Sequence, residues 1–271
     1  MTDSASAPGL TTGQRRFIVV SPIVFAAFVW ALYYVTHSGY LFLLREYMVV
    51  EDLQFVFYLS ASVLAAFVAY RLWRAGTVEG MADAVSKRLG VLYGVGAVGL
   101  FFVAGEEVSW GEELWERILP FYPDKEEMRS LGNKQGETTL HNMGSVNHIF
   151  SYLLFAIAAY GVLSPLLKMA LDRARPNLPG WVDYLVFPRV TMAGLGIATA
   201  FFVVKAIVLP HEQKDPGASL EAFRRYQEVA ELYISFSLLL LTWLRLQVTP
   251  PARSVDEVSS RRRMRARRTS G

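Results

Sequence analysis

The sequence predicts an all-α membrane protein, a bundle of about six transmembrane helices with both termini in the cytoplasm. Hydrophobic residues make up 53% of the 271 residues, a larger share than soluble domains usually carry. The apolar residues form six long runs, each close to the roughly 20 residues that a helix needs to cross a bilayer. Basic residues also gather on one side of the resulting topology, which is typical of the cytoplasmic face.

The six predicted spans are distributed along the whole chain, and the sequence shows no repeat and no soluble domain between them. They are residues 17–36, 53–72, 89–105, 143–167, 190–209 and 229–248. Residues 1–16 are polar and rich in small side chains, so we expect a disordered lead before an uncleaved first span. The bundle then occupies residues 17–248, with a long outer loop at 111–140, and a basic cytoplasmic tail fills residues 249–271.

The third span is the shortest of the six and carries several glycines. They are Gly90, Gly94, Gly96 and Gly99. Small residues let membrane helices approach closely, so we expect this helix near the centre of the bundle. Before the fifth span, Pro188 suits the start of a helix.

Charged residues divide between the two sides of the predicted bundle. With the N-terminus inside, 18 of the 27 basic residues lie on the cytoplasmic side, which favours this orientation. Outside lie 17 of the 24 acidic residues and all four histidines, His37, His141, His148 and His211. Titratable side chains therefore concentrate at the outer end of the bundle.

Three spans carry polar side chains at helical spacing where they reach the outer end. The three stripes are Glu106, Ser109, Trp110 and Glu113; His141, Ser145, His148 and Tyr152; and Glu228, Glu231 and Ser235. Residues three, four and seven apart share one face of a helix. We therefore expect three helices to present polar groups at one depth, beneath the loop at 111–140.

Two chemistries use carboxylate and imidazole groups in such a place. In a metal site, the ligands are Glu107, His141, His148, Glu228 and Glu231, and the ion is zinc, iron or manganese. In metal-free acid–base catalysis, burial and mutual repulsion keep one carboxyl group protonated and ready for proton transfer. The catalytic candidates are Glu106, Glu107, His141 and Asn142. Glu112, Glu113 and Glu116 fit a simple interfacial belt beside Trp110 and Trp115.

The leading functional hypothesis is a membrane enzyme, a hydrolase or transferase acting on a lipid or a lipid-linked substrate. The alternatives are a transporter or sensor that binds cations or protons, and a scaffold subunit of a membrane complex. The chain has no cysteine, which excludes disulfides and thiolate chemistry. No HExxH, GxSxG or Walker motif occurs in the sequence. No GxGxxG spacing follows a predicted strand, so the sequence has no dinucleotide-binding fingerprint.

Two segments, GEEVSWGEELW and NKQGETTLHN, carry a resemblance to a family. They are similar to the GEExSWG…NxQGExxLHN signature of uncharacterised polytopic membrane proteins of bacteria and archaea. The family has Gln where this chain has Glu112. The paired glutamates and the later His and Asn also show a weak similarity to CPBP-type intramembrane proteases. The EExxxR motif of those proteases requires Arg at the position of Gly111, and their FxxxH motif is not visible near His141.

The C-terminal tail SSRRRMRARRTSG is strongly basic. A cytoplasmic polybasic segment next to a span attracts anionic lipid headgroups, each Arg contributing about 1 kcal/mol near the surface. A topological anchor without a partner explains the tail equally well. We therefore expect membrane lipids as partners and no nucleic acid, because the chain has no nucleic-acid-binding module.

Overall fold

The computed structural model describes residues 9–44, 49–74, 81–107, 144–175, 178–208 and 225–251. At Leu41, residues 144–148 and Val208 it describes the backbone alone. This part of the chain is helical and contains no strand. The predicted outer loop at 111–140, His141, Asn142 and the tail beyond residue 251 lie outside the described residues.

Six helical segments of the described chain are long and apolar enough to cross a membrane, which confirms the predicted number. The helices are α1 (Thr12–Val35), α2 (His37–Leu44), α3 (Val49–Arg74), α4 (Asp83–Glu107), α7 (Gly144–Ala174), α8 (Met192–Val208) and α10 (Gln227–Val248). Two short 3₁₀ helices, η2 (Gly180–Tyr184) and η3 (Arg189–Thr191), lead into α8. Helices α2 and α3 together make the second segment.

Helices α1 and α4 begin well before the apolar runs indicate. Helix α1 starts at Thr12, inside the predicted N-terminal lead, because Thr11 and Gln14 form a capping box. The Gln14 N–H donates to Oγ1 of Thr11 at 3.3 Å, and the Thr11 N–H donates to Oε1 of Gln14 at 2.8 Å. Helix α4 starts at Asp83 and has 25 residues, so the third span is not short. Its last two residues are Glu106 and Glu107.

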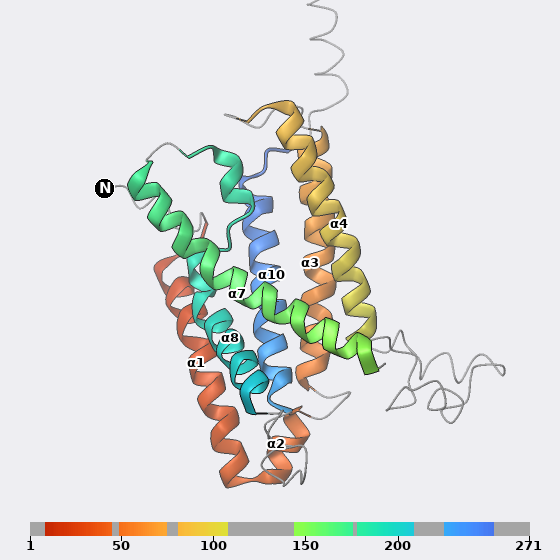
Figure 1. Ribbon diagram of the computed structural model, residues 1–271, viewed down its shortest axis with the longest axis vertical. Helices are drawn as coiled ribbons and strands as arrows, with labels where there is room; N and C mark the ends of the chain where they lie inside the picture. Colours follow the sequence, from red (N-terminus) through yellow and green to blue (C-terminus); the bar gives the residue numbers. More distant parts are fainter. Residues whose placement is uncertain are drawn as a thin grey trace, which may run out of the picture.

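Helix α10 is the central helix of the described bundle, and it lies between α3 and α8 (Figure 1). Val229, Ala230 and Ile234 on this helix are completely buried. The prediction that the third span is central is therefore wrong, because α4 packs mainly along α3 on one flank.

Only part of the glycine pattern in α4 serves close packing. A Cβ added at Gly90 would lie 3.2 Å from the carbonyl oxygen of Ala69 on α3, so the two backbones meet there. Gly96 and Gly99 have no atom within 4 Å of an added Cβ. These two glycines do not draw α4 into the centre.

The helix directions give the bundle two chemically different ends. Helices α3 and α10 begin at the end where α4 and α8 finish, which is the lower end in Figure 1. We call it the acidic end, because it carries Glu51, Glu106, Glu107, Glu228 and Glu231. The opposite end, the basic end, is held by arginines that bond backbone carbonyls. Arg71 donates to Leu246 and Thr249, and Arg245 donates to Val186.

Candidate functional site

Carboxylates from three helices meet at the acidic end. Glu106 and Glu231 are buried, with 3% and 6% of their surface exposed. Glu107, Glu228 and Glu51 are half-buried. Because α4 ends where α3 and α10 begin, the helix directions alone bring these residues to one level.

The carboxylate of Glu107 lies in the field of the others. The charges that act on it are, from strongest to weakest, those of Glu231, Glu228, Glu51 and Glu106. Burial in a medium of low dielectric constant strengthens such repulsion. Ionised carboxylates are costly in this position unless a proton, a cation or a hydrogen-bond donor compensates them.

Gln54 on α3 joins the cluster to α10. Its side chain is fully buried, and its Nε2 donates to the Glu228 carbonyl oxygen at 2.7 Å and to Oε2 of Glu228 at 3.3 Å. The Gln54 Oε1 is also buried and has no hydrogen-bond partner among the described residues. The Nε2 of Gln54 therefore links α3 to α10, whereas its Oε1 makes no hydrogen bond with the described residues.

Tyr58 lies one turn further along α3 and is 2% exposed. Its hydroxyl group is close enough to Glu107, Glu231 and Glu228 to interact with their charges. Within the described part of the chain, that hydroxyl also has no hydrogen-bond partner. Leaving a buried polar atom unsatisfied costs about 1–3 kcal/mol, so these two atoms beside one carboxylate cluster are destabilising unless a further polar group bonds them.

The ammonium group of Lys205 is linked to the carboxylate cluster by two hydrogen bonds through the neutral amide of Gln227. The Nζ of Lys205 on α8 donates to Oε1 of Gln227. The Nε2 of Gln227 donates in turn to Oε1 of Glu231 at 2.5 Å. Glu231 thereby accepts a hydrogen bond from an amide that is itself polarised by an ammonium group, which favours the ionised carboxylate. Arg225, near the start of α10, also acts on the charge of Glu228.

The cluster is closed toward the basic end. Between Tyr58 and Arg71 on α3, Arg88 and Glu106 on α4, and Glu231 and Arg245 on α10, the sequence has no charged residue. Several hydroxyl groups in this region donate to backbone carbonyls, as Ser62 does to Ala97 at 2.8 Å and Ser237 does to Tyr233 at 2.6 Å. The stretches of α3, α4 and α10 between the two ends therefore offer no charged group that would carry an ion across.

The structure describes only some of the predicted metal ligands. In the described part of the chain, no group of three His, Asp or Glu residues is close enough to hold a metal ion. His141, Asn142 and the side chain of His148 lie outside the described residues. A metal site that uses His141 or His148 with Glu107, Glu228 or Glu231 therefore remains a prediction.

The polar stripe predicted at the start of the fourth span does not continue into the bundle. Tyr152 on α7 is 70% exposed, so this end of the stripe faces away from the described helices. Helical spacing identifies residues that share a face, but it does not say toward which neighbour that face turns.

Four residues of the cluster are not identified by the sequence patterns. Gln54, Tyr58 and Gln227 are neutral, so a search for charges beside apolar runs passes over them. A usable signal is the spacing of Glu51, Gln54 and Tyr58, which puts all three on one face of α3. Lys205 also carries a signal, because a charge inside an apolar span usually has a functional or pairing role.

Comparison with known proteins adds no assignment. No protein family, no curated protein and no solved structure matches this chain.

Proposed function

We propose that this chain is a multi-pass protein of the cell membrane, with the basic end and both termini in the cytoplasm. The six helices that are long and apolar enough to span a membrane support this proposal. The excess of Arg and Lys at one end supports the orientation. The carboxylate cluster then faces outward at the edge of the hydrocarbon core.

The proposed activity is hydrolysis or group transfer on a lipid or lipid-linked substrate. A site at the edge of the bilayer meets amphiphilic molecules, whose headgroup can reach the carboxylates while the acyl chains stay in the membrane. The observation that carries the proposal is the pair of buried acceptor and hydroxyl groups, Gln54 Oε1 and the Tyr58 hydroxyl, beside carboxylates from three helices. A substrate that donates to Gln54 and bonds Tyr58 would satisfy both.

The surroundings of the glutamates suggest different roles for them. Glu231 accepts a hydrogen bond from the Lys205-bound amide of Gln227, so it suits the general base that takes a proton from water or from an acceptor hydroxyl group. Glu107 is surrounded by four like charges, so it suits the acid that gives a proton to the leaving oxygen. The attacking oxygen forms the new bond as the bond to the leaving oxygen breaks, and Tyr58 orients the reacting group.

A divalent metal remains an extension of this proposal and not a requirement. One or two of Glu107, Glu228 and Glu231 would supply oxygen ligands, and His141 and His148 would supply the remaining ligands for zinc, iron or manganese. A bound ion would polarise the substrate or lower the pKa of a bound water. Elemental analysis of purified protein, with His141→Ala beside it, tests this extension.

The test of the enzymatic proposal is a search for lipid conversion. Full-length protein in nanodiscs made from a total bacterial lipid extract is incubated and its lipids are compared by mass spectrometry with those of empty nanodiscs. We expect at least one lipid species to be consumed by the parent protein and not by Glu107→Gln. The matched control is Asp52→Asn, which removes an exposed carboxylate at the same end. Unchanged lipids with the parent protein, in extracts from several membranes, would contradict an enzyme acting on lipids.

A second candidate function, cation or proton sensing, is favoured by the charge balance of the cluster. Of the described residues at the acidic end, five glutamates and Asp52 face only Lys205 and Arg225 as full positive charges. Cation binding would relieve that imbalance. Cation sensing would be supported if calcium, magnesium or sodium raises the melting temperature of the parent but not that of Glu228→Gln. Loss of lipid conversion in Glu228→Gln would instead support the enzymatic proposal.

A further inference from the structure

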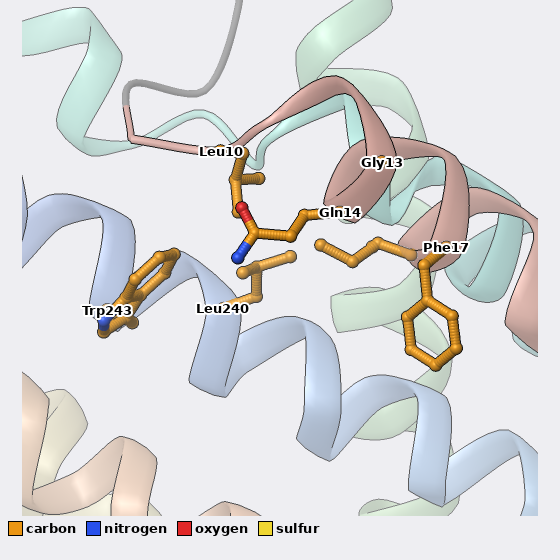
Figure 2. A pocket seen from close by; sticks show the side chains of 7 residues that line it. Leu10, Gly13, Gln14, Phe17, Leu240 and Trp243 are labelled. Carbon is orange, nitrogen blue, oxygen red and sulfur yellow. The ribbon is translucent and has the colours of Figure 1, made fainter.

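A groove lies between α1 and α10 at the basic end, far along both helices from the carboxylate cluster. The two helices meet where the Tyr233 hydroxyl donates to the carbonyl oxygen of Pro22 at 2.6 Å. Closer to the basic end they bound an open groove of about 450 Å³ (Figure 2). Leu10, Gly13, Gln14 and Phe17 form its α1 side, and Leu240 and Trp243 form its α10 side.

The groove is mainly apolar, and its polar side-chain groups are the Gln14 amide and the indole N–H of Trp243. Phe17 is 70% exposed at its edge, and Leu240 and Trp243 form the opposite wall. The Oε1 of Gln14 accepts from Thr11 in the capping box. Its Nε2 donates to no other described residue, and Figure 2 shows this amide directed toward the α10 wall. The groove thus combines an apolar wall with the amide donor of Gln14 near a helix end.

The charges at the basic end of the bundle, where the groove lies, are mostly positive. Arg15 and Arg16 follow Gln14 directly in the first turns of α1. The other described basic residues at this end are Arg71, Arg74, Lys87, Arg88, Lys168, Arg173, Arg175, Arg189 and Arg245. Against these stand Asp83, Asp172 and Asp183. A cluster of this kind beside a membrane attracts anionic headgroups.

We propose that the groove binds one anionic phospholipid of the surrounding membrane. An acyl chain lies along Phe17, Leu240 and Trp243, and the phosphate group meets Gln14 Nε2 within the positive field of Arg15 and Arg16. This inference rests on the proposed membrane insertion, but it is independent of the carboxylate site. Glu107→Gln should therefore leave lipid binding in the groove unchanged.

Other occupants fit the groove less well. Residues 1–8 are polar, and residues 252–271 carry seven arginines, so neither matches an apolar wall beside Arg15 and Arg16. A second copy of the chain would bring its own basic end into the same positive field, and like charges placed together at an interface are unfavourable. An anionic lipid matches both the wall and the charge.

The chain offers a variant that fills the groove without disturbing the fold. A Cβ added at Gly13 would meet only Oγ1 of Thr11, at 4.0 Å, so a Leu side chain has room to extend into the groove. Leu also has a higher helix propensity than Gly. The matched control is Gly99→Leu on α4, where an added Cβ has no atom within 4 Å.

Native mass spectrometry of the full-length protein, titrated with phosphatidylglycerol or phosphatidylcholine, tests the proposal. We expect Gly13→Leu to weaken binding of the tightest phosphatidylglycerol by about tenfold or more, which corresponds to about 1.4 kcal/mol. Gly99→Leu should bind as the parent does. Undiminished binding by Gly13→Leu would overturn the proposal.

Two further results separate the headgroup from the acyl chain and from a second copy. Arg16→Gln should reduce the preference for phosphatidylglycerol over phosphatidylcholine several-fold, whereas Arg88→Gln, an exposed arginine on α4, should not. Equal binding of the two lipids by the parent protein would refute an anionic occupant. A parent dimer that Gly13→Leu converts to a monomer would assign the groove to self-association.

Discussion

Replacing Gln54 by Met tests the arrangement of the carboxylate cluster without changing any charge. The two side chains are similar in size, but Met loses the donor that holds Glu228 and also the unpartnered Oε1. The bond to the Glu228 carbonyl contributes about 0.5–1.5 kcal/mol, and a bond to a charged group contributes about 1.5–3 kcal/mol. Removing the unsatisfied Oε1 stabilises the folded state by about 1–3 kcal/mol. The expected net loss is therefore about 1 kcal/mol.

Thermal unfolding of the full-length protein in one detergent measures this difference. A loss of that size should lower the melting temperature of a chain of this length by about 2–4 °C. The control is Gln247→Met, at an exposed position on the same bundle, where we expect less than about 0.5 kcal/mol. In a Glu228→Gln background the effect of Gln54→Met should shrink, because the charged bond is already gone.

The result that would refute the reasoning is specific. If Gln54→Met is as stable as Gln247→Met, or more stable than the parent, then Gln54 does not tie α3 to α10 through Glu228. An effect of Gln54→Met that is unchanged in the Glu228→Gln background would show that the loss comes from packing and not from the hydrogen bonds.

Three further predictions test the charge relay, the helix packing and the topology. Lys205→Met should destabilise the protein by about 1–3 kcal/mol, because it removes the cation linked to Glu231 through Gln227. In a Glu231→Gln background the same substitution should cost less. Equal losses in both backgrounds would contradict the link from Lys205 to Glu231. Gly90→Leu should cost about 1–3 kcal/mol because an added Cβ meets the α3 backbone, whereas Gly96→Leu should cost little; similar melting temperatures for the two variants would refute the packing. Reporters fused after Thr77 and Pro176 should signal from the cytoplasm and those after Asp124 and Asp215 from outside, and two successive fusions on one side would rule out the topology.

The number of helices is predictable from the sequence, but their limits and neighbours are not. Apolar runs depend on composition alone, so they reveal six segments. The start of α1 depends on the capping box between Thr11 and Gln14, to which a hydropathy average is insensitive. The central place of α10 depends on which face each helix turns inward. Four glycines in α4 suggest a central helix, yet two of them face open space.

The candidate site is predictable to a similar degree. Glu106, Glu107, Glu228 and Glu231 stand out because charges beside apolar runs are costly. Their convergence follows from helix direction, since α4 ends where α3 and α10 begin. The contributions of Gln54 and Tyr58 follow only from three-dimensional packing, because a neutral side chain gives no sign in the sequence that its polar atom will be buried without a partner. The roles of His141 and Asn142 remain predictions.

The central claim is that the glutamates at the acidic end act together as one site. The most direct test is the rate of lipid conversion by Glu107→Gln, Glu231→Gln and the double variant, with Asp52→Asn as the control. Groups that act as a unit are strongly non-additive, so the double variant should be no slower than the worse of the two single variants. Each single variant should lose at least about 100-fold, the contribution typical of a general acid or base. Rates for Glu107→Gln and Glu231→Gln that equal the rate of Asp52→Asn, or losses that multiply in the double variant, would contradict a shared site.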